Sequence, residues 1–185
     1  MPNKPSKLRR ITLLSIMAAA CIAIQLIPRP PNVEFTSVIT FTVGVVFGSV
    51  FGATLGALVM LINGFLSPFG FGGLLVPFQM LGMTIIGFVG GLFKEFGIFK
   101  KITTEGTARL CVEAAVLGAF LTLVYDIITN AGFAVTFGVP IIAAILTGVA
   151  LSVIHVSSNT ILFGFLAIPL SYAMQNVLGD RKPRQ

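Results

Sequence analysis

Charged side chains are scarce in this sequence. It has 12 Lys and Arg and 6 Asp and Glu among 185 residues, whereas 56% of its residues are hydrophobic and the mean hydropathy is +1.01. Soluble domains carry about 25% charged residues. The polar intervals between the apolar runs reach only roughly a dozen residues, which leaves no room for a large soluble domain. The composition therefore predicts an all-α, polytopic integral membrane protein.

Several chemical signatures are also missing from the sequence. It has neither a phosphate-binding G-x-x-x-x-G-K-[ST] loop nor a G-x-G-x-x-G turn between a strand and a helix, and no Ser sits in a recognisable nucleophile elbow. Cys21 and Cys111 lie inside apolar runs without the spacing of a metal site, and His155, Asp126 and Glu34 are the only plausible metal donors. We therefore expect no enzyme, no cofactor and no bound metal.

The few positive charges are unevenly placed along the chain. Apart from Arg29, they precede the first apolar run, flank one internal break or follow the last run: Lys4, Lys7, Arg9 and Arg10; Lys94, Lys100, Lys101 and Arg109; Arg181, Lys182 and Arg184. Cytoplasmic loops of membrane proteins carry such an excess. The net charge of +6 thus indicates topology and not nucleic-acid binding. We expect a cytoplasmic basic N-terminus (1–10), one transmembrane domain (11–174) and a cytoplasmic basic tail (175–185) in the plasma membrane.

The apolar runs predict six transmembrane helices. A single helix over 38–65 would be about 42 Å long, more than a bilayer requires, so we divide this run into two spans with a tight turn near Gly48. Residues 137–150 are apolar but short, and they predict an extra helix that lies over the bundle between the fifth and sixth spans. The other predicted spans are 11–27, 75–93, 107–131 and 151–174.

Two pairs of polar residues interrupt the last apolar runs. Asn130 follows Asp126 by four residues, and Asn159 follows His155, the only His, by the same interval. Residues at this spacing share one helix face about 6 Å apart along the axis. Because ionisable groups inside a membrane are costly, they indicate a substrate or ion site. We expect all four side chains to lie at one depth.

The remaining polar residues in external positions extend this hypothesis to a small-molecule pocket. Amide side chains offer both donors and acceptors to a ligand, and aromatic rings offer stacking. The predicted binding residues are Asn32, Glu34, Asn63, Gln79, Asp126, Asn130, His155 and Asn159, with walls from Phe69, Phe71, Tyr125 and Phe133. Three alternatives stay open: amides that only bond neighbouring helices in a structural scaffold, a channel, and an ion- or proton-coupled transporter with an Asp126–His155 relay.

Small residues recur every four positions in the first predicted span. Ser15, Ala19 and Ala23 form a ridge that lets another helix approach closely. This helix could belong to the same bundle or to a partner protein.

The layout of the whole chain resembles a known family. A basic N-terminus precedes a helix with Ala19-Ala20-Cys21-Ile22-Ala23, a Pro-rich external loop, two short Gly-rich helices and two late helices with polar residues. This order resembles the substrate-binding S components of energy-coupling factor (ECF) transporters, in the branch of riboflavin and related vitamin carriers.

The resemblance implies a carrier that captures a vitamin or related micronutrient at the external face. It implies docking through the first helix, with Ser15, Ala19 and Ala23, onto a transmembrane coupling subunit driven by two ATPase subunits. Nickel and cobalt members carry a His after the initiating Met, where this chain has Pro2, and the lack of Trp argues against a thiamin-type site. Riboflavin, pantothenate, folate-like, cobalamin and nucleobase-derived ligands remain open.

Overall fold

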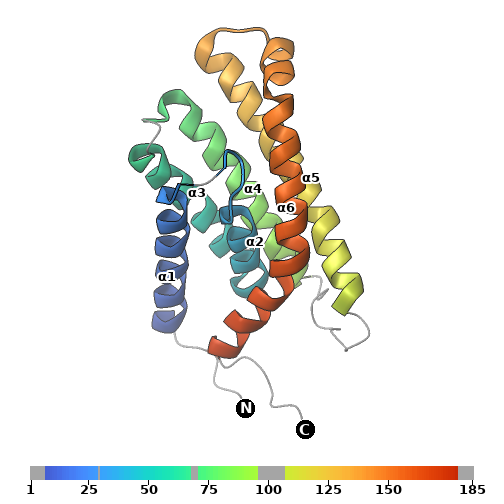
Figure 1. Ribbon diagram of the computed structural model, residues 1–185. Coiled ribbons are helices and arrows are strands. Elements are labelled where there is room, and N and C mark those ends of the chain that lie inside the picture. Colours follow the sequence, from blue (N-terminus) through green and yellow to red (C-terminus); the bar gives the residue numbers. More distant parts are fainter. Residues whose placement is uncertain (1–6, 29, 68–70, 96–106, 179–185) are drawn as a thin grey trace.

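The computed structural model describes residues 7–28, 30–67, 71–95 and 107–178 (Figure 1). Every regular element in this part is a helix, which confirms the predicted all-α class. The elements are α1 (Lys7–Leu26), α2 (Thr36–Phe47), α3 (Ser49–Leu66), the 3₁₀ turn η1 (Gly73–Leu75), α4 (Val76–Glu95), α5 (Thr107–Phe137) and α6 (Ile141–Leu178). Of the predicted pocket walls, Phe69 lies outside the described residues.

Five of these helices are long and apolar enough to cross a membrane, and α2 is the exception. Its 12 residues extend about 18 Å, less than the roughly 30 Å of the hydrocarbon core. All of them are buried, so α2 is the central helix of the bundle. The predicted count of six full crossings therefore holds only in part. The predicted break is confirmed at Gly48, whose φ of +108° is a conformation that residues with a Cβ rarely adopt.

Helices α2, α3 and α4 are joined by glycines whose backbones touch. A Cβ on Gly91 would lie 2.0 Å from the backbone nitrogen of Ser49, and one on Gly87 would lie 2.1 Å from the carbonyl oxygen of Gly52. Small residues permit this approach, and it gains dispersion contacts over the whole length of a helix pair. These three helices form a tightly packed unit against which the other helices lie.

We expect Gly91→Ala to destabilise the protein by roughly 1–3 kcal/mol, because backbone atoms cannot move aside for the new methyl group. Thermal unfolding in detergent measures the effect, followed in a Cys111→Ser background with a maleimide dye that reacts when the buried Cys21 becomes exposed. Gly164→Ala is the matched control in another helix, since its Cβ would meet the Ala115 Cβ at 3.2 Å. Equal melting temperatures for the two variants would contradict the close packing at Gly91.

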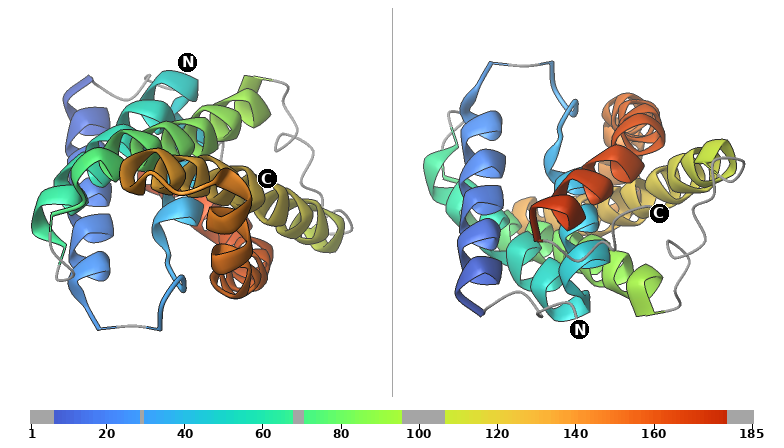
Figure 2. Two further views of the ribbon diagram at one scale, coloured as in Figure 1. Left: turned by 90° about the horizontal axis from the view of Figure 1, so that it is seen from above. Right: turned by 90° about the horizontal axis from the view of Figure 1, so that it is seen from below.

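Helices α5 and α6 form a long antiparallel pair that rises past the ends of the other helices (Figure 1). The predicted separate helix over 137–150 is wrong, because α6 runs without interruption from Ile141 to Leu178. Gly138, with a φ of +65°, and Pro140 make the only break, and no proline follows until Pro169. Helix α5 is strongly inclined when seen along the bundle, whereas much of α6 is seen nearly end-on (Figure 2). The incline helps the 31-residue α5 fit a bilayer.

The first turn of α1 and the last turn of α6 meet at one end of the bundle (Figures 1 and 2). There the Arg9 guanidinium donates a hydrogen bond to the main-chain oxygen of Val177. The described ends of the chain therefore lie on the same side, as the distribution of Lys and Arg requires.

Candidate ligand-binding site

A pocket of about 1120 Å³ opens at the other end of the bundle, where α1 ends and α2 begins. Every predicted binding residue except Asn159 lines it: Asn32, Glu34, Asn63, Gln79, Asp126, Asn130 and His155. The predicted walls Phe71, Tyr125 and Phe133 line it as well. Its size lies just above the usual range of roughly 300–1,000 Å³ for small-molecule sites, and residues far apart in the sequence meet there.

The deepest polar group of the pocket is a triad of Glu34, Asp126 and His155. The His155 Nδ1 lies 2.7 Å from Asp126 Oδ1, and its Nε2 lies 3.6 Å from Glu34 Oε1. The side chains of His155, Asp126 and Glu34 are 6%, 8% and 11% exposed. The Tyr125 ring meets the imidazole edge to face at a centroid distance of 5.7 Å. The triad thus joins α5, α6 and the segment before α2.

The two carboxylates approach opposite nitrogens of the imidazole ring and do not converge on one point. Within the described ranges no group of three His, Cys, Asp or Glu side chains is arranged to hold a metal ion. His155 therefore lies between two acids: its Nδ1 is in hydrogen-bond contact with Asp126, and its Nε2 faces Glu34 without a hydrogen-bond partner.

Glu34 is held in place by the start of α2. The Ser37 backbone N–H donates to Glu34 Oε2 at 3.0 Å, so the carboxylate accepts one of the N–H groups that a first helical turn leaves free. A negative charge is also favoured at a helix N-terminus. Asn159 adds a bond from its Nδ2 to Glu34 Oε1 at 3.3 Å and another to Thr122 Oγ1 at 3.0 Å. The short α2 thereby brings Glu34 into the bundle.

The four residues of the two pairs do not lie at one depth, which corrects the prediction. Helices α5 and α6 are antiparallel (Figure 1), so four residues onward leads toward the mouth of the pocket on α5 and away from it on α6. Asn130 therefore lines the pocket about one turn above Asp126, whereas Asn159 is fully buried beneath it. Between the two helices, Asp126 and His155 are the members of the two pairs that meet directly. Asn159 is the one predicted residue that the structure does not bring to the pocket.

Asn32 fastens the segment 30–35 to α6. Its Nδ2 donates to the Leu151 carbonyl at 3.0 Å, and its own carbonyl accepts from Ser158 Oγ at 3.1 Å. Asn32 has a φ of +59°, in the left-handed region where Asn is tolerated better than most residues. The side chain and the backbone conformation of Asn32 both serve this attachment.

We expect Asn32→Ala to weaken ligand binding more than Asn32→Gly does. Both variants lose the bond to Leu151, but only Ala adds roughly 1 kcal/mol of strain at positive φ. Ligand titration of both variants in detergent measures the difference. If the two variants bind equally well, the backbone conformation of Asn32 has no part in forming the pocket.

Some pocket residues were missed by the sequence reasoning. Gln25 lines the pocket and donates to Thr36 Oγ1 at 2.8 Å, and it could have been found because it is an amide within the first apolar run. Thr129 gave no signal, since helical hydroxyls are ordinary in apolar spans and commonly bond their own helix, as Thr129 does. Met60 and Phe137 were indistinguishable from residues that face lipid.

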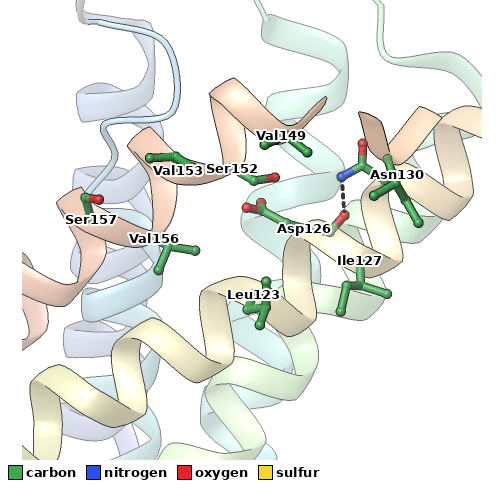
Figure 3. A pocket seen from close by; sticks show the side chains of 10 residues that line it. Leu123, Asp126, Ile127, Asn130, Val149, Ser152, Val153, Val156 and Ser157 are labelled. Atoms are coloured by element: carbon green, nitrogen blue, oxygen red, sulfur yellow. Dashed lines mark hydrogen bonds between the residues drawn. The ribbon is translucent and has the colours of Figure 1, made fainter. Parts of the chain in front are cut away.

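A second hollow of about 460 Å³ lies between α5 and α6 (Figure 3). It shares Asp126, Asn130 and Ser152 with the main pocket, and its other walls are mostly apolar. In Figure 3 Asp126 and Ser152 face each other across the helix pair, and the Asn130 amide bonds the Asp126 carbonyl at 2.8 Å. Asp126 therefore stands in the wall between the pocket and this lateral groove.

Comparison with known proteins identifies the fold. The family model described as "ECF-type riboflavin transporter, S component" matches residues 6–175. The chain belongs to this family. Neither the comparison with curated proteins nor that with solved structures finds a match. The family assignment confirms the resemblance seen in the sequence: this S component is a multi-pass membrane subunit of a transporter and not an enzyme.

Proposed function

We propose that this S component captures riboflavin at the external face and passes it to an ATP-driven importer. The pocket carries the proposal: it is large enough for a tricyclic ring, has aromatic walls in Phe71, Tyr125 and Phe133, and ends on a cluster of buried polar groups. Flat heteroaromatic ligands need this combination of stacking surface and placed hydrogen-bonding groups. The family description, which names riboflavin, supports the choice among the vitamins that the sequence leaves open.

Quenching of flavin fluorescence tests the proposal directly. We expect riboflavin to bind the purified protein saturably, and we expect Tyr125→Leu to weaken binding by roughly 10-fold because a stacking ring is lost. Phe120→Leu is the matched control, since Phe120 lies on the same helix and is 61% exposed. If no flavin binds, and mass spectrometry of the small molecule that co-purifies shows another compound, riboflavin is the wrong substrate.

The orientation follows from the charges. We propose that the pocket faces outward and that both chain termini are cytoplasmic. The Lys and Arg of the termini and of 94–109 flank the predicted spans at the ends opposite the pocket, and cytoplasmic segments carry such an excess. Thiol labelling of a Cys placed at either end, from outside intact cells, distinguishes the two orientations.

We further propose that α1 carries the docking surface for the transmembrane coupling subunit, which two ATPase subunits drive. Ser15, Ala19 and Ala23 are all exposed, whereas Cys21 and Gln25 on the other side of the helix are buried. The Ser15 hydroxyl bonds the Ile11 carbonyl at 3.0 Å and so is satisfied within its own helix. The ridge therefore offers a smooth surface of small side chains, which suits a close helix–helix contact.

A stand-alone proton-coupled transporter is the second candidate. The observation that favours it is the 2.7 Å contact of His155 and Asp126, a distance over which a proton can pass. Uptake by the chain expressed without any ATPase, abolished by a protonophore, would support this function. Uptake that requires the ATPases supports the first.

A further inference from the structure

The described lining of the pocket has two acids, one histidine, and neither Lys nor Arg. Two carboxylates, from Glu34 and Asp126, surround one imidazole, and none of the described residues that line the pocket is Lys or Arg. If at least one carboxylate is ionised, the triad is neutral or negative in every protonation state of His155. An anion brought against this group would be repelled in a water-poor site, where charge interactions are strong.

The pocket also has an acceptor without a donor. Asp126 is only 5% exposed, and its Oδ2 has no hydrogen-bond partner. Its Oδ1 is in contact with His155. A turn above, the Asn130 Nδ2 donates one of its two N–H groups to the Asp126 carbonyl, and the Asn130 Oδ1 can accept from a ligand. A buried acceptor such as Asp126 Oδ2 is costly unless it is paired. The α5 side of the pocket is therefore suited to a ligand that donates hydrogen bonds.

We infer that Asp126 and Asn130 receive hydroxyl or N–H donors of an uncharged or cationic ligand, and that the pocket rejects ligands with a phosphate or carboxylate. The inference rests on the proposed function, and it adds the chemical form in which the vitamin is taken. For a flavin, this form is the free vitamin with its polyhydroxyl chain and not the phosphate ester. An acidic wall thereby makes the carrier select by charge as well as by shape.

Matched pairs of compounds that differ by one anionic group test the inference. The probes are riboflavin and riboflavin 5′-phosphate, panthenol and pantothenate, and pyridoxine and its 5′-phosphate. We expect riboflavin to bind at least roughly 100-fold more tightly than its phosphate. We expect Asp126→Asn, which keeps the shape and removes the charge, to reduce this ratio at least roughly 10-fold.

Comparison with a flavin that lacks the polyhydroxyl chain separates the contribution of hydrogen bonds to binding from that of charge. Asp126→Ala should weaken the binding of riboflavin more than that of lumiflavin, which has a methyl group in place of the chain. Asn63→Ala serves as the comparison variant, because Asn63 also lines the pocket but on α3. An equal loss for both flavins in Asp126→Ala would overturn the assignment of the donors to Asp126.

Arg29 is the one cation of the sequence between Arg10 and Lys94, and it lies outside the described residues. Arg29→Gln should leave the preference for uncharged ligands intact. The inference is overturned if the phosphate binds as tightly as riboflavin, or if Asp126→Asn leaves their ratio unchanged, and in both cases the proposed function stands. If another pair binds in place of the flavins, the proposed substrate is wrong and the same comparison is made within that pair. If no pair binds, both proposals fail.

Discussion

His155→Ala is expected to be the most damaging single substitution in this protein. It leaves the carboxylates of Asp126 and Glu34 buried without the imidazole between them, and loss of one partner from a buried ion pair costs roughly 3–5 kcal/mol. Asp126→Ala is expected to cost less, because one buried carboxylate, Glu34, then remains and the His155 imidazole still lies beside it. The expected order of the two stability losses follows from the composition of the triad, which has two acids and one base.

Thermal unfolding in detergent tests this order. We expect the melting temperature of His155→Ala to fall by roughly 10 °C, and that of Asp126→Ala by clearly less. The double variant His155→Ala, Asp126→Ala should be more stable than His155→Ala alone, because it removes one of the two stranded acids. If Asp126→Ala is the less stable of the two single variants, the triad is not an ion-pair network centred on His155.

The meeting of Asp126 and His155 could be predicted from the sequence in part. Periodicity places each residue on a face of its helix, and the Gly138–Pro140 break, almost midway between them, folds α5 back against α6. What failed was the reasoning about depth. The prediction treated Asn130 and Asn159 as equivalent, although in antiparallel helices the same four-residue step leads in opposite directions. The predicted start of the last helix was also wrong, because hydropathy gives no boundary where one apolar helix simply continues.

Glu34 shows what the sequence could not supply. Its place in a Pro-rich connection predicts a residue near the surface, and the sequence does not reveal how far this connection enters the bundle. That depth depends on the short α2, whose 12 residues are all buried, and on the bond from the Ser37 N–H. Irregular backbone is tolerated within a membrane protein where other protein groups satisfy it or where it lines a cavity. The position of Glu34 is therefore a property of tertiary packing and not of local sequence pattern.

Ala19→Trp is expected to abolish uptake while leaving ligand binding unchanged. Ala19 is exposed in the middle of the α1 ridge, on the side of the helix away from the buried Cys21 and Gln25. The indole therefore has free space in the isolated protein, but it would occupy the surface that we assign to the coupling subunit. A bulky group at a close helix contact costs roughly 1–3 kcal/mol, which corresponds to a loss of roughly 5- to 150-fold in affinity for the partner.

Two assays on the same variant separate docking from capture. Co-purification with the coupling subunit and ATPases, together with vitamin uptake, should be lost in Ala19→Trp, whereas titration of the isolated protein should match the unmodified chain. Ala150→Trp is the control, because Ala150 is also exposed but lies on α6, away from the ridge. If both Trp variants transport normally, α1 is not the docking surface. If Ala19→Trp fails to bind ligand, the ridge supports the bundle itself, which is the alternative that its spacing leaves open.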